Sequence, residues 1–187
     1  GLPDLLYSFG TMHPGAITLH NDPRFFQSLQ KEDSEHLTDM GTVDILRDRE
    51  RGVPRYNQFR RLLHKRPIAS FEELTLNPVW AAELRAVYDG RIEDIDLMVG
   101  LYGEAPPPGF GFSDTAFRIF ILMASRRLKS DRFFTTDYTA TVYTPEGMRW
   151  IDDNTMSTVL LRHCPELQPY LAQVENAFAP WPYARGR

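Results

Sequence analysis

The stretch from residue 44 to residue 61, DILRDRERGVPRYNQFRR, constrains the fold of this chain most. Six arginines, two aspartates and one glutamate surround a Gly-Val-Pro break at residues 52–54. Glycine is favoured just past the end of a helix and proline at the start of one. We therefore predict a helix over 43–51 that stops at Gly52 and a second helix that starts at Pro54. The two helices would meet at a charged corner.

Apolar side chains interrupt this charge run at near-helical spacing: Ile45, Leu46, Val53, Tyr56 and Phe59. A solvated charge run rarely carries so many of them, so we expect the charges to face a packed interior or a bound anion. The second helix would place three apolar side chains on one face, namely Tyr56, Phe59 and Leu63. The alternative is a pair of surface helices joined by ion pairs between residues four apart.

Much of the remaining chain has the pattern of helices separated by loops that contain proline. Ser70 and Glu73 have the spacing of a capping box at a helix N-terminus. Asn77-Pro78 precedes a helix that Gly90 ends. Two further helices are expected to start at 144–146 and at 154. The sequence thus predicts a mainly α chain.

The most apolar predicted helix spans 115–128, and we expect it to be central and buried. Two runs, 133–136 and 139–143, have the composition of β-strands. From Pro165 onward, further prolines predict a tail that lies over the body. The sequence contains no repeat and no composition typical of a domain linker.

Composition restricts the class of protein. The chain has 187 residues, a formal net charge of −4 and no apolar run as long as a membrane helix, although peripheral membrane contact stays open. An acidic balance argues against a nucleic-acid partner. Cys164 is the single cysteine, which excludes an internal disulfide and favours a cytoplasmic or peripheral membrane location over a secreted one.

The order of residues at the charged corner resembles a signature of the animal-type haem peroxidase superfamily, also called the peroxidase–cyclooxygenase superfamily. Residues 47–57 read RDRERGVPRYN, and the superfamily has Arg-x-Arg-Asp/Glu-x-Gly-hydrophobic-Pro-x-Tyr-Asn. Within the superfamily the sequence is most similar to the fatty-acid α-dioxygenases. That likeness continues in the same order through Ile95–Leu101, Ser113–Phe117, Ala124–Leu128, Asp131–Thr136 and Tyr143–Gly147.

This resemblance covers roughly residues 37–165 and implies the C-terminal part of a haem peroxidase-type helical catalytic domain. In that superfamily the distal histidine, the radical-forming tyrosine and the proximal histidine precede the matched region. We therefore expect no catalytic residue within 1–187. The N-terminal portion of the enzyme, in the same polypeptide or as a separate chain, would supply them.

Four residues of the charged corner have roles implied by the resemblance. Asp44 occupies the position of the side chain that accepts the N–H of the proximal histidine, which would tune the iron. The alternative for Asp44 is an ordinary helix aspartate. Arg47, Arg49 and Arg51 would bind haem propionates or the proximal helix, or form a structural ion network with neighbouring acids.

The resemblance also implies a substrate contact. In the α-dioxygenases the second arginine of a Ser-Arg-Arg block, here Arg127, binds the carboxylate of the fatty acid. The apolar helix before Arg127 would then form a channel wall that holds the α-carbon beside the tyrosyl radical. A simpler role for Arg126 and Arg127 is to face the negative end of the helix dipole.

The resemblance implies haem b as cofactor and a fatty acid and O2 as substrates, with a 2-hydroperoxy acid as product. Alternatives are a peroxidase that oxidises small substrates with hydrogen peroxide, and an inactive scaffold or interaction subunit. We expect no metal ligand in this chain, because the histidines are scattered and none has a metal-site spacing: His13, His20, His36, His64 and His163.

Overall fold

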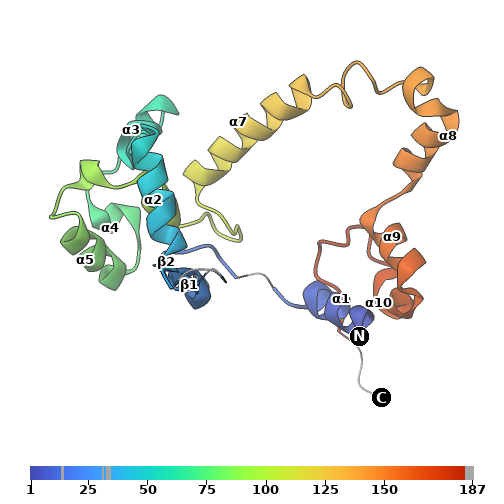
Figure 1. Cartoon of the computed structure of the whole chain (residues 1–187), viewed down its shortest axis with the longest axis horizontal. Helices are drawn as coiled ribbons and strands as arrows, with labels where there is room; N and C mark the ends of the chain where they lie inside the picture. The colour runs from blue at the N-terminus through green and yellow to red at the C-terminus, as the bar shows by residue number, and fades with distance from the viewer. Residues whose placement is uncertain (14, 31, 33–34, 184–187) are drawn as a thin grey trace. The chain divides into compact units, whose positions relative to one another are not determined.

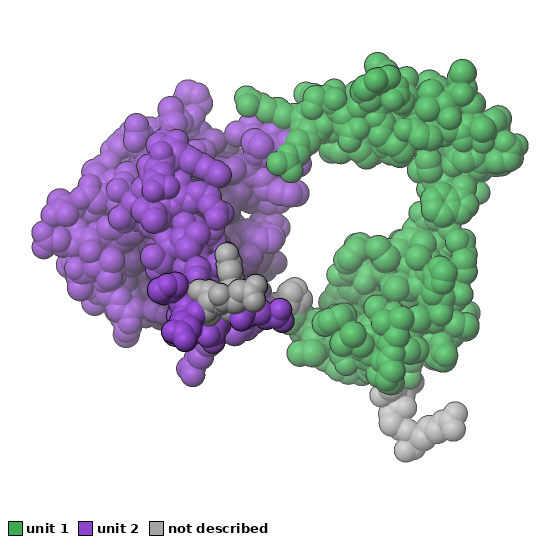
Figure 2. Space-filling model, in the orientation of Figure 1, with its two compact units in different colours: residues 1–14, 125–187 green, residues 15–124 purple. Residues whose placement is uncertain are grey.

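The computed structural model describes residues 1–13, 15–30, 32 and 35–183. These residues form ten α-helices, three short 3-10 helices and one pair of two-residue strands (Figure 1). They separate into two compact units (Figure 2), which we call the central unit, residues 15–124, and the terminal unit, residues 1–14 and 125–187. The chain passes between the units twice, and the second crossing, between residues 124 and 125, falls inside a helix, where the sequence shows no linker. The prediction of a mainly α chain is confirmed.

The central unit contains two 3-10 helices, the strand pair and most of the helices that surround the charged corner. Its elements are η1 (Arg24–Gln27), β1 (Leu29–Gln30), β2 (Leu37–Thr38), α2 (Met40–Glu50), α3 (Tyr56–Leu62), α4 (Phe71–Leu74), α5 (Pro78–Val87), η2 (Ile92–Asp94), α6 (Leu97–Gly103) and the start of α7 (Asp114–Ser130). The strands are antiparallel, with Leu29 opposite Thr38. Helix α3 packs against α6 and η2, and α4 packs against α5.

The charged corner folds as predicted. Helix α2 ends at Glu50, and Gly52 follows with φ 70°, a conformation that glycine adopts without steric cost. The backbone N–H of Val53 donates to the carbonyl of Asp48 at 2.9 Å, which closes the helix end in a Schellman motif. Helix α3 begins at Tyr56, two residues after Pro54.

The predicted helix caps at 70 and 77 are also confirmed. The Ser70 hydroxyl accepts from the N–H of Glu73 at 3.2 Å, and the Asn77 side chain accepts from the N–H of Val79 at 3.0 Å. Gly90 has φ 72° shortly after the end of α5. These helices surround the main buried cluster of the central unit, which consists of Tyr56, Ile68, Phe71, Leu74, Ala81, Leu84, Tyr88 and Ile95.

A buried asparagine fastens the loop between α3 and α4. The Asn57 side-chain amide donates to the carbonyl of Ile68 at 2.9 Å, and its carbonyl oxygen accepts from the N–H of Ile68 at 2.9 Å. It also donates to the Glu93 carboxylate at 3.0 Å. A single side chain therefore pairs with the Ile68 backbone much as a neighbouring strand would.

The terminal unit holds the two ends of the chain. Its elements are α1 (Leu2–Thr11), the end of α7, α8 (Ala140–Asp153), α9 (Met156–His163), η3 (Pro165–Leu167) and α10 (Gln168–Leu171). The buried residues Cys164, Leu167, Leu171 and Trp181 form its core. The N–H of Trp181 donates to the carbonyl of Gly10 at 2.8 Å, so the segment after Pro165 packs on α1, as predicted.

Three predictions about individual elements are wrong. Helix α7 has its predicted extent but is not buried: Phe120, Leu122 and Met123 are 64%, 48% and 47% exposed. An apolar helix is buried only if another surface covers it, and the described part of this chain does not cover that face. Residues 133–136 form turns and residues 140–143 belong to α8, because no strand lies beside them to pair with.

No helix in the described residues is long and apolar enough to cross a membrane.

Candidate functional site

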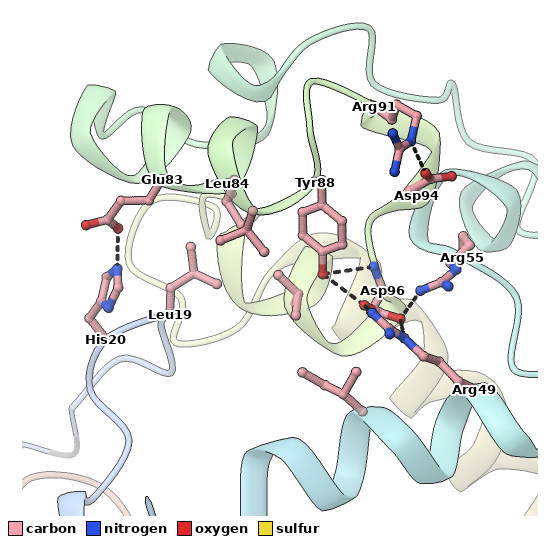
Figure 3. Close-up of a pocket in the computed structure, with 13 residues that line it drawn as sticks. Leu19, His20, Arg49, Arg55, Glu83, Leu84, Tyr88, Arg91, Asp94 and Asp96 are labelled. Carbon is pink, nitrogen blue, oxygen red and sulfur yellow. Dashed lines mark hydrogen bonds and ion pairs between the residues drawn. The ribbon is translucent and has the colours of Figure 1, made fainter.

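A buried carboxylate, Asp96, binds two arginines of the charged corner. It lies at the start of α6 and is 4% exposed. Arg49 on α2 binds it with two bonds, Nε to Oδ1 at 2.9 Å and Nη2 to Oδ2 at 2.6 Å. Arg55, just before α3, donates to Oδ1, and the Tyr88 hydroxyl donates to Oδ2 at 3.0 Å (Figure 3). We call these four residues the Asp96 cluster.

The cluster favours the ionised carboxylate. Burial opposes ionisation of Asp96, but the hydrogen bonds from Arg49 and Tyr88 and the charge of Arg55 outweigh it and lower the pKa of Asp96. Burial and the bonded carboxylate raise the pKa of Tyr88 to about 12. The cluster is thus an ion pair network with a neutral phenol at neutral pH.

A second network, the Glu104 cluster, lies on the other side of α3. Arg60 Nη1 and Lys65 Nζ approach the Glu104 carboxylate at 3.2 and 3.5 Å. The Tyr56 hydroxyl donates to the same carboxylate at 2.9 Å, and Lys65 also pairs with Asp114 at 2.5 Å. Arg118 also pairs with Asp114, at 3.1 Å, so this network joins α3 to the start of α7 through three cations and two anions.

The arginines implied by the resemblance therefore lie in different environments. Arg49 belongs to the Asp96 cluster. Arg47 Nη1 lies 3.4 Å from the Asp44 carboxylate in an exposed pair. Arg51 is exposed and makes no ion pair with the described residues. The geometry places Arg49 in a structural ion network, and it leaves Arg47 and Arg51 accessible to an external anion.

Asp44 lies on a groove of the central unit. The groove has a volume of about 680 Å³, and its walls include Asp44 and Ile45 of α2 and Met98 and Tyr102 of α6. The Asp44 side chain is 46% exposed. Burial, and then the charges of Asp22 and Asp44, raise the pKa of Tyr102. No histidine of the described residues lines this groove.

An apolar pocket of about 390 Å³ shares Tyr102 with that groove. Its walls come from the segment before η1, from α6 and from the first turns of α7. They consist of Ile17, Leu101, Tyr102, Phe112, Ser113, Ala116, Phe117 and Phe120. A pocket with so few polar atoms suits a hydrocarbon group.

Arg126 and Arg127 lie in the last part of α7. Both are exposed and neither makes an ion pair with the described residues. Their position agrees with a role at the negative helix end, and Arg127 is also free to bind an anion. No group of three or more His, Cys, Asp or Glu side chains in the described residues could hold a metal ion.

Three residues of the Asp96 cluster, Asp96, Tyr88 and Arg55, were not among the site residues predicted from the sequence. Asp96 lies between Ile95 and Leu97, and an acid flanked by apolar residues is a signal for a buried, paired charge, although Glu93 and Asp94 just before it weaken that signal. Tyr88 has no such signal, because a tyrosine in a core helix is common. The pairing itself joins residues 41 and 47 positions apart, which spacing cannot reveal.

The profile described as animal haem peroxidase matches residues 1–178, nearly the whole chain. The chain therefore belongs to the animal haem peroxidase family, and the resemblance seen at the charged corner is confirmed. A haem cofactor is characteristic of this family.

Particular relatives are similar over almost all of the chain. Alpha-dioxygenase 2 of Arabidopsis thaliana is 46% identical over 187 residues, which is 97% of this chain and 30% of the relative. The crystal structure of Oryza sativa fatty acid alpha-dioxygenase superposes with a TM-score of 0.87 at 41% identity, over 99% of this chain and 31% of that one. Peroxidase A from Dictyostelium discoideum is less similar, with a TM-score of 0.57 and 28% identity over 68% of this chain.

These matches confirm the predicted fold class. The chain adopts the helical fold of the alpha-dioxygenase structures, although it spans only about 30% of the length of the curated relatives that it matches.

Proposed function

We propose that this chain forms part of a haem-dependent fatty-acid α-dioxygenase, which converts a fatty acid and O2 into a 2-hydroperoxy acid through a tyrosyl radical. One observation carries the proposal: an exposed apolar face of α7 lines the apolar pocket and leads along the helix to the unpaired Arg127. The alpha-dioxygenases of Arabidopsis thaliana and Oryza sativa support the choice of reaction.

Helical spacing selects Arg127 over Arg126. Seven residues separate Phe120 from Arg127, which is nearly two full turns and a rise of roughly 10 Å, so the two side chains lie on almost the same side of α7. Arg126 lies about 120° away around the helix. A fatty acid whose hydrocarbon lies along the Phe120 face would therefore meet the guanidinium of Arg127.

The groove at Asp44 fits a haem-side role. The carboxylate on α2 is accessible and can accept the N–H of an imidazole, which would orient a proximal histidine and raise its basicity. Arg47 and Arg51 on the same helix are exposed and could pair with carboxylates such as propionates. Haem b, when bound, would supply the oxidising equivalents for the tyrosine. The residues of this chain would position it and would leave the iron ligand to another segment.

The distal histidine, the radical tyrosine and the proximal histidine would come from the remaining portion of the enzyme, in the same polypeptide or as a separate partner chain. The exposed apolar face of α7 supports such a partner, because apolar patches of this kind commonly mark a covered surface. The acidic net charge of −4 gives no support to a nucleic-acid partner.

The experiment is substitution of Arg127 in the assembled enzyme. We expect Arg127→Ala to lower kcat/KM for long-chain acids roughly ten- to a hundredfold and to scatter the position of oxygenation, because a charge-assisted contact worth about 1.5–3 kcal/mol is lost. Arg126→Ala is the matched control, and its regiochemistry should stay at the α-carbon. Wild-type kinetics and regiochemistry in both variants would contradict the proposal.

A further inference from the structure

A pocket of about 570 Å³ lies beside the Asp96 cluster in the central unit (Figure 3). We call it the Asp96 pocket. Its volume is in the range of small-molecule sites. Arginine side chains of the Asp96 cluster lie at one side of it. The remaining wall is mixed: it has the aliphatic side chains of Leu19, Ile45, Leu84, Val87 and Val99 and the polar side chains of His20, Glu83, Arg91 and Asp94.

The hydrogen-bonding capacity of Asp96 is completely used. An ionised carboxylate offers about four acceptor positions, two on each oxygen. Oδ1 accepts from Arg49 Nε and from Arg55 Nη1, and Oδ2 accepts from Arg49 Nη2 and from the Tyr88 hydroxyl. Asp96 therefore cannot take a further donor from either guanidinium.

Both guanidinium groups keep donors that nothing in the described residues accepts. Arg55 makes one bond, to Asp96, although a guanidinium has five N–H groups. Arg49 makes two bonds, both to Asp96. The two side chains are 38% and 50% exposed, so a ligand can reach them. Within the cluster two positive charges share one negative charge, and the remaining wall adds one arginine and two acids, so the formal charges of the pocket lining balance.

The rest of the rim limits which anion fits. His20 pairs with Glu83 at 2.7 Å on one side of the pocket, and Arg91 pairs with Asp94 at 2.5 Å on another (Figure 3). Glu83 and Asp94 would repel a second negative charge on the ligand. The aliphatic wall would gain from burial of a hydrocarbon group.

We propose that the Asp96 pocket binds a singly charged organic carboxylate with a short apolar body. Its carboxylate would accept the free N–H groups of Arg55 and Arg49, and its body would lie against Leu84 and Val99. This site involves neither Arg127 nor the apolar pocket at α7, so it stands independently of the proposed dioxygenase activity.

Hexanoate added to the 187-residue chain tests the proposal. We expect saturable binding by calorimetry, with backbone amide shifts centred on Tyr88, Asp96 and Val99. Hexanamide, which has the same shape without the charge, should bind at least tenfold more weakly. Inorganic phosphate should also bind more weakly than hexanoate. These comparisons use the unchanged chain and need no variant to fold.

Arg55→Gln should weaken hexanoate binding at least tenfold. Arg85→Gln is the matched control, because it removes the same charge from an exposed ion pair in the same unit and does not line the pocket; we expect less than a twofold change. Three results would each overturn the site. The first is that binding does not saturate by about 10 mM hexanoate. The second is that phosphate binds as tightly as hexanoate, and the third is that both variants lose hexanoate affinity equally. Shifts centred on Phe117 and Phe120 would place the ligand elsewhere and overturn it as well.

Discussion

A single carboxylate fixes the arrangement of four segments in the central unit. Asp96 begins α6 and binds Arg49 of α2, Arg55 before α3 and Tyr88 after α5. Each of these bonds involves a charged group, and such bonds are stronger than bonds between neutral groups. Because Asp44 lies on the same helix as Arg49, the Asp96 cluster also sets where the Asp44 carboxylate stands.

We predict that Asp96→Asn lowers the free energy of unfolding of the central unit by about 1–3 kcal/mol at pH 7, since two guanidinium groups lose their anion but remain able to bind water. The loss should depend on pH. The folded-state pKa of Asp96 is lowered, so its contribution is complete above the unfolded-state pKa of about 3.9 and disappears as pH falls through the lower folded-state value. Urea denaturation of both proteins from pH 7 to pH 2 measures this.

The control for this prediction is Glu146→Gln, which breaks the exposed pair between Glu146 and Arg149. An exposed pair contributes little, so the change in unfolding free energy should stay below about 1 kcal/mol. A difference between wild type and Asp96→Asn that stays constant down to pH 2 would show that the Asp96 charge is not the source of the stability.

The charges of the corner were evident from the sequence, but their partners were not. The apolar residues within residues 44–61 correctly indicated that an arginine faces a packed interior, as Arg60 does, whereas Arg49 is half-exposed and reaches the buried Asp96. They could not indicate which acids bind these arginines. Asp96 and Glu104 come close to the arginines only when α6 packs against α3. The roles of Asp44, Arg47, Arg51 and Arg127 remain predictions.

Among the helices, ends were easier to predict than burial. Caps and glycines act within a few residues, so Ser70, Asn77 and Gly52 marked their helices correctly. Burial of α7 depends on whether another surface packs against it, and the composition of the helix does not show whether such a surface is present. The β-leaning runs failed for the same reason, since a strand needs a neighbour at hydrogen-bonding distance.

Helix α6 can pack closely against Tyr56 only because residue 100 is glycine. A Cβ atom there would lie 2.2 Å from Tyr56 Cγ, and Tyr56 is fully buried. We predict that Gly100→Ala destabilises the central unit by about 1–3 kcal/mol through overpacking, in spite of the roughly 1 kcal/mol that alanine gains in a helix. Thermal or urea unfolding followed by circular dichroism would measure the loss.

Gly111→Ala is the matched control, because a Cβ atom at Gly111 meets nothing within 4 Å. Its unfolding free energy should change by no more than about 0.5 kcal/mol. If Gly100→Ala were as stable as Gly111→Ala, the close contact between α6 and the Tyr56 ring would be disproved.

The described residues of the molecule form two hydrophobic cores and leave extensive apolar surface. Each unit has its own buried cluster, one around Tyr56 and one around Trp181. Large apolar side chains of α7 are exposed, and the chain spans about 30% of the length of its curated relatives. These properties agree with the proposal that further polypeptide covers α7 and supplies the iron ligand.

We predict that haemin titrated into the 187-residue chain alone gives no stoichiometric histidine-ligated spectrum, because no histidine in the described part of the chain lines the groove at Asp44. Absorption spectroscopy in the Soret region measures this. The same titration of His13→Gln, an exposed histidine of the terminal unit, should look identical. Tight one-to-one binding with a histidine-ligated spectrum would show that this chain holds the iron by itself.

The bonds between Asn57 and Ile68 have a consequence for the exchange of backbone hydrogens with solvent. Ile68 lies in a loop, where amide hydrogens usually exchange through local openings of low free energy. Its N–H is instead held by a fully buried side chain, and both residues are nearly inaccessible to water. Exchange at Ile68 therefore requires the loop, α3 and η2 to separate together, so this amide should report the opening of the central unit as a whole.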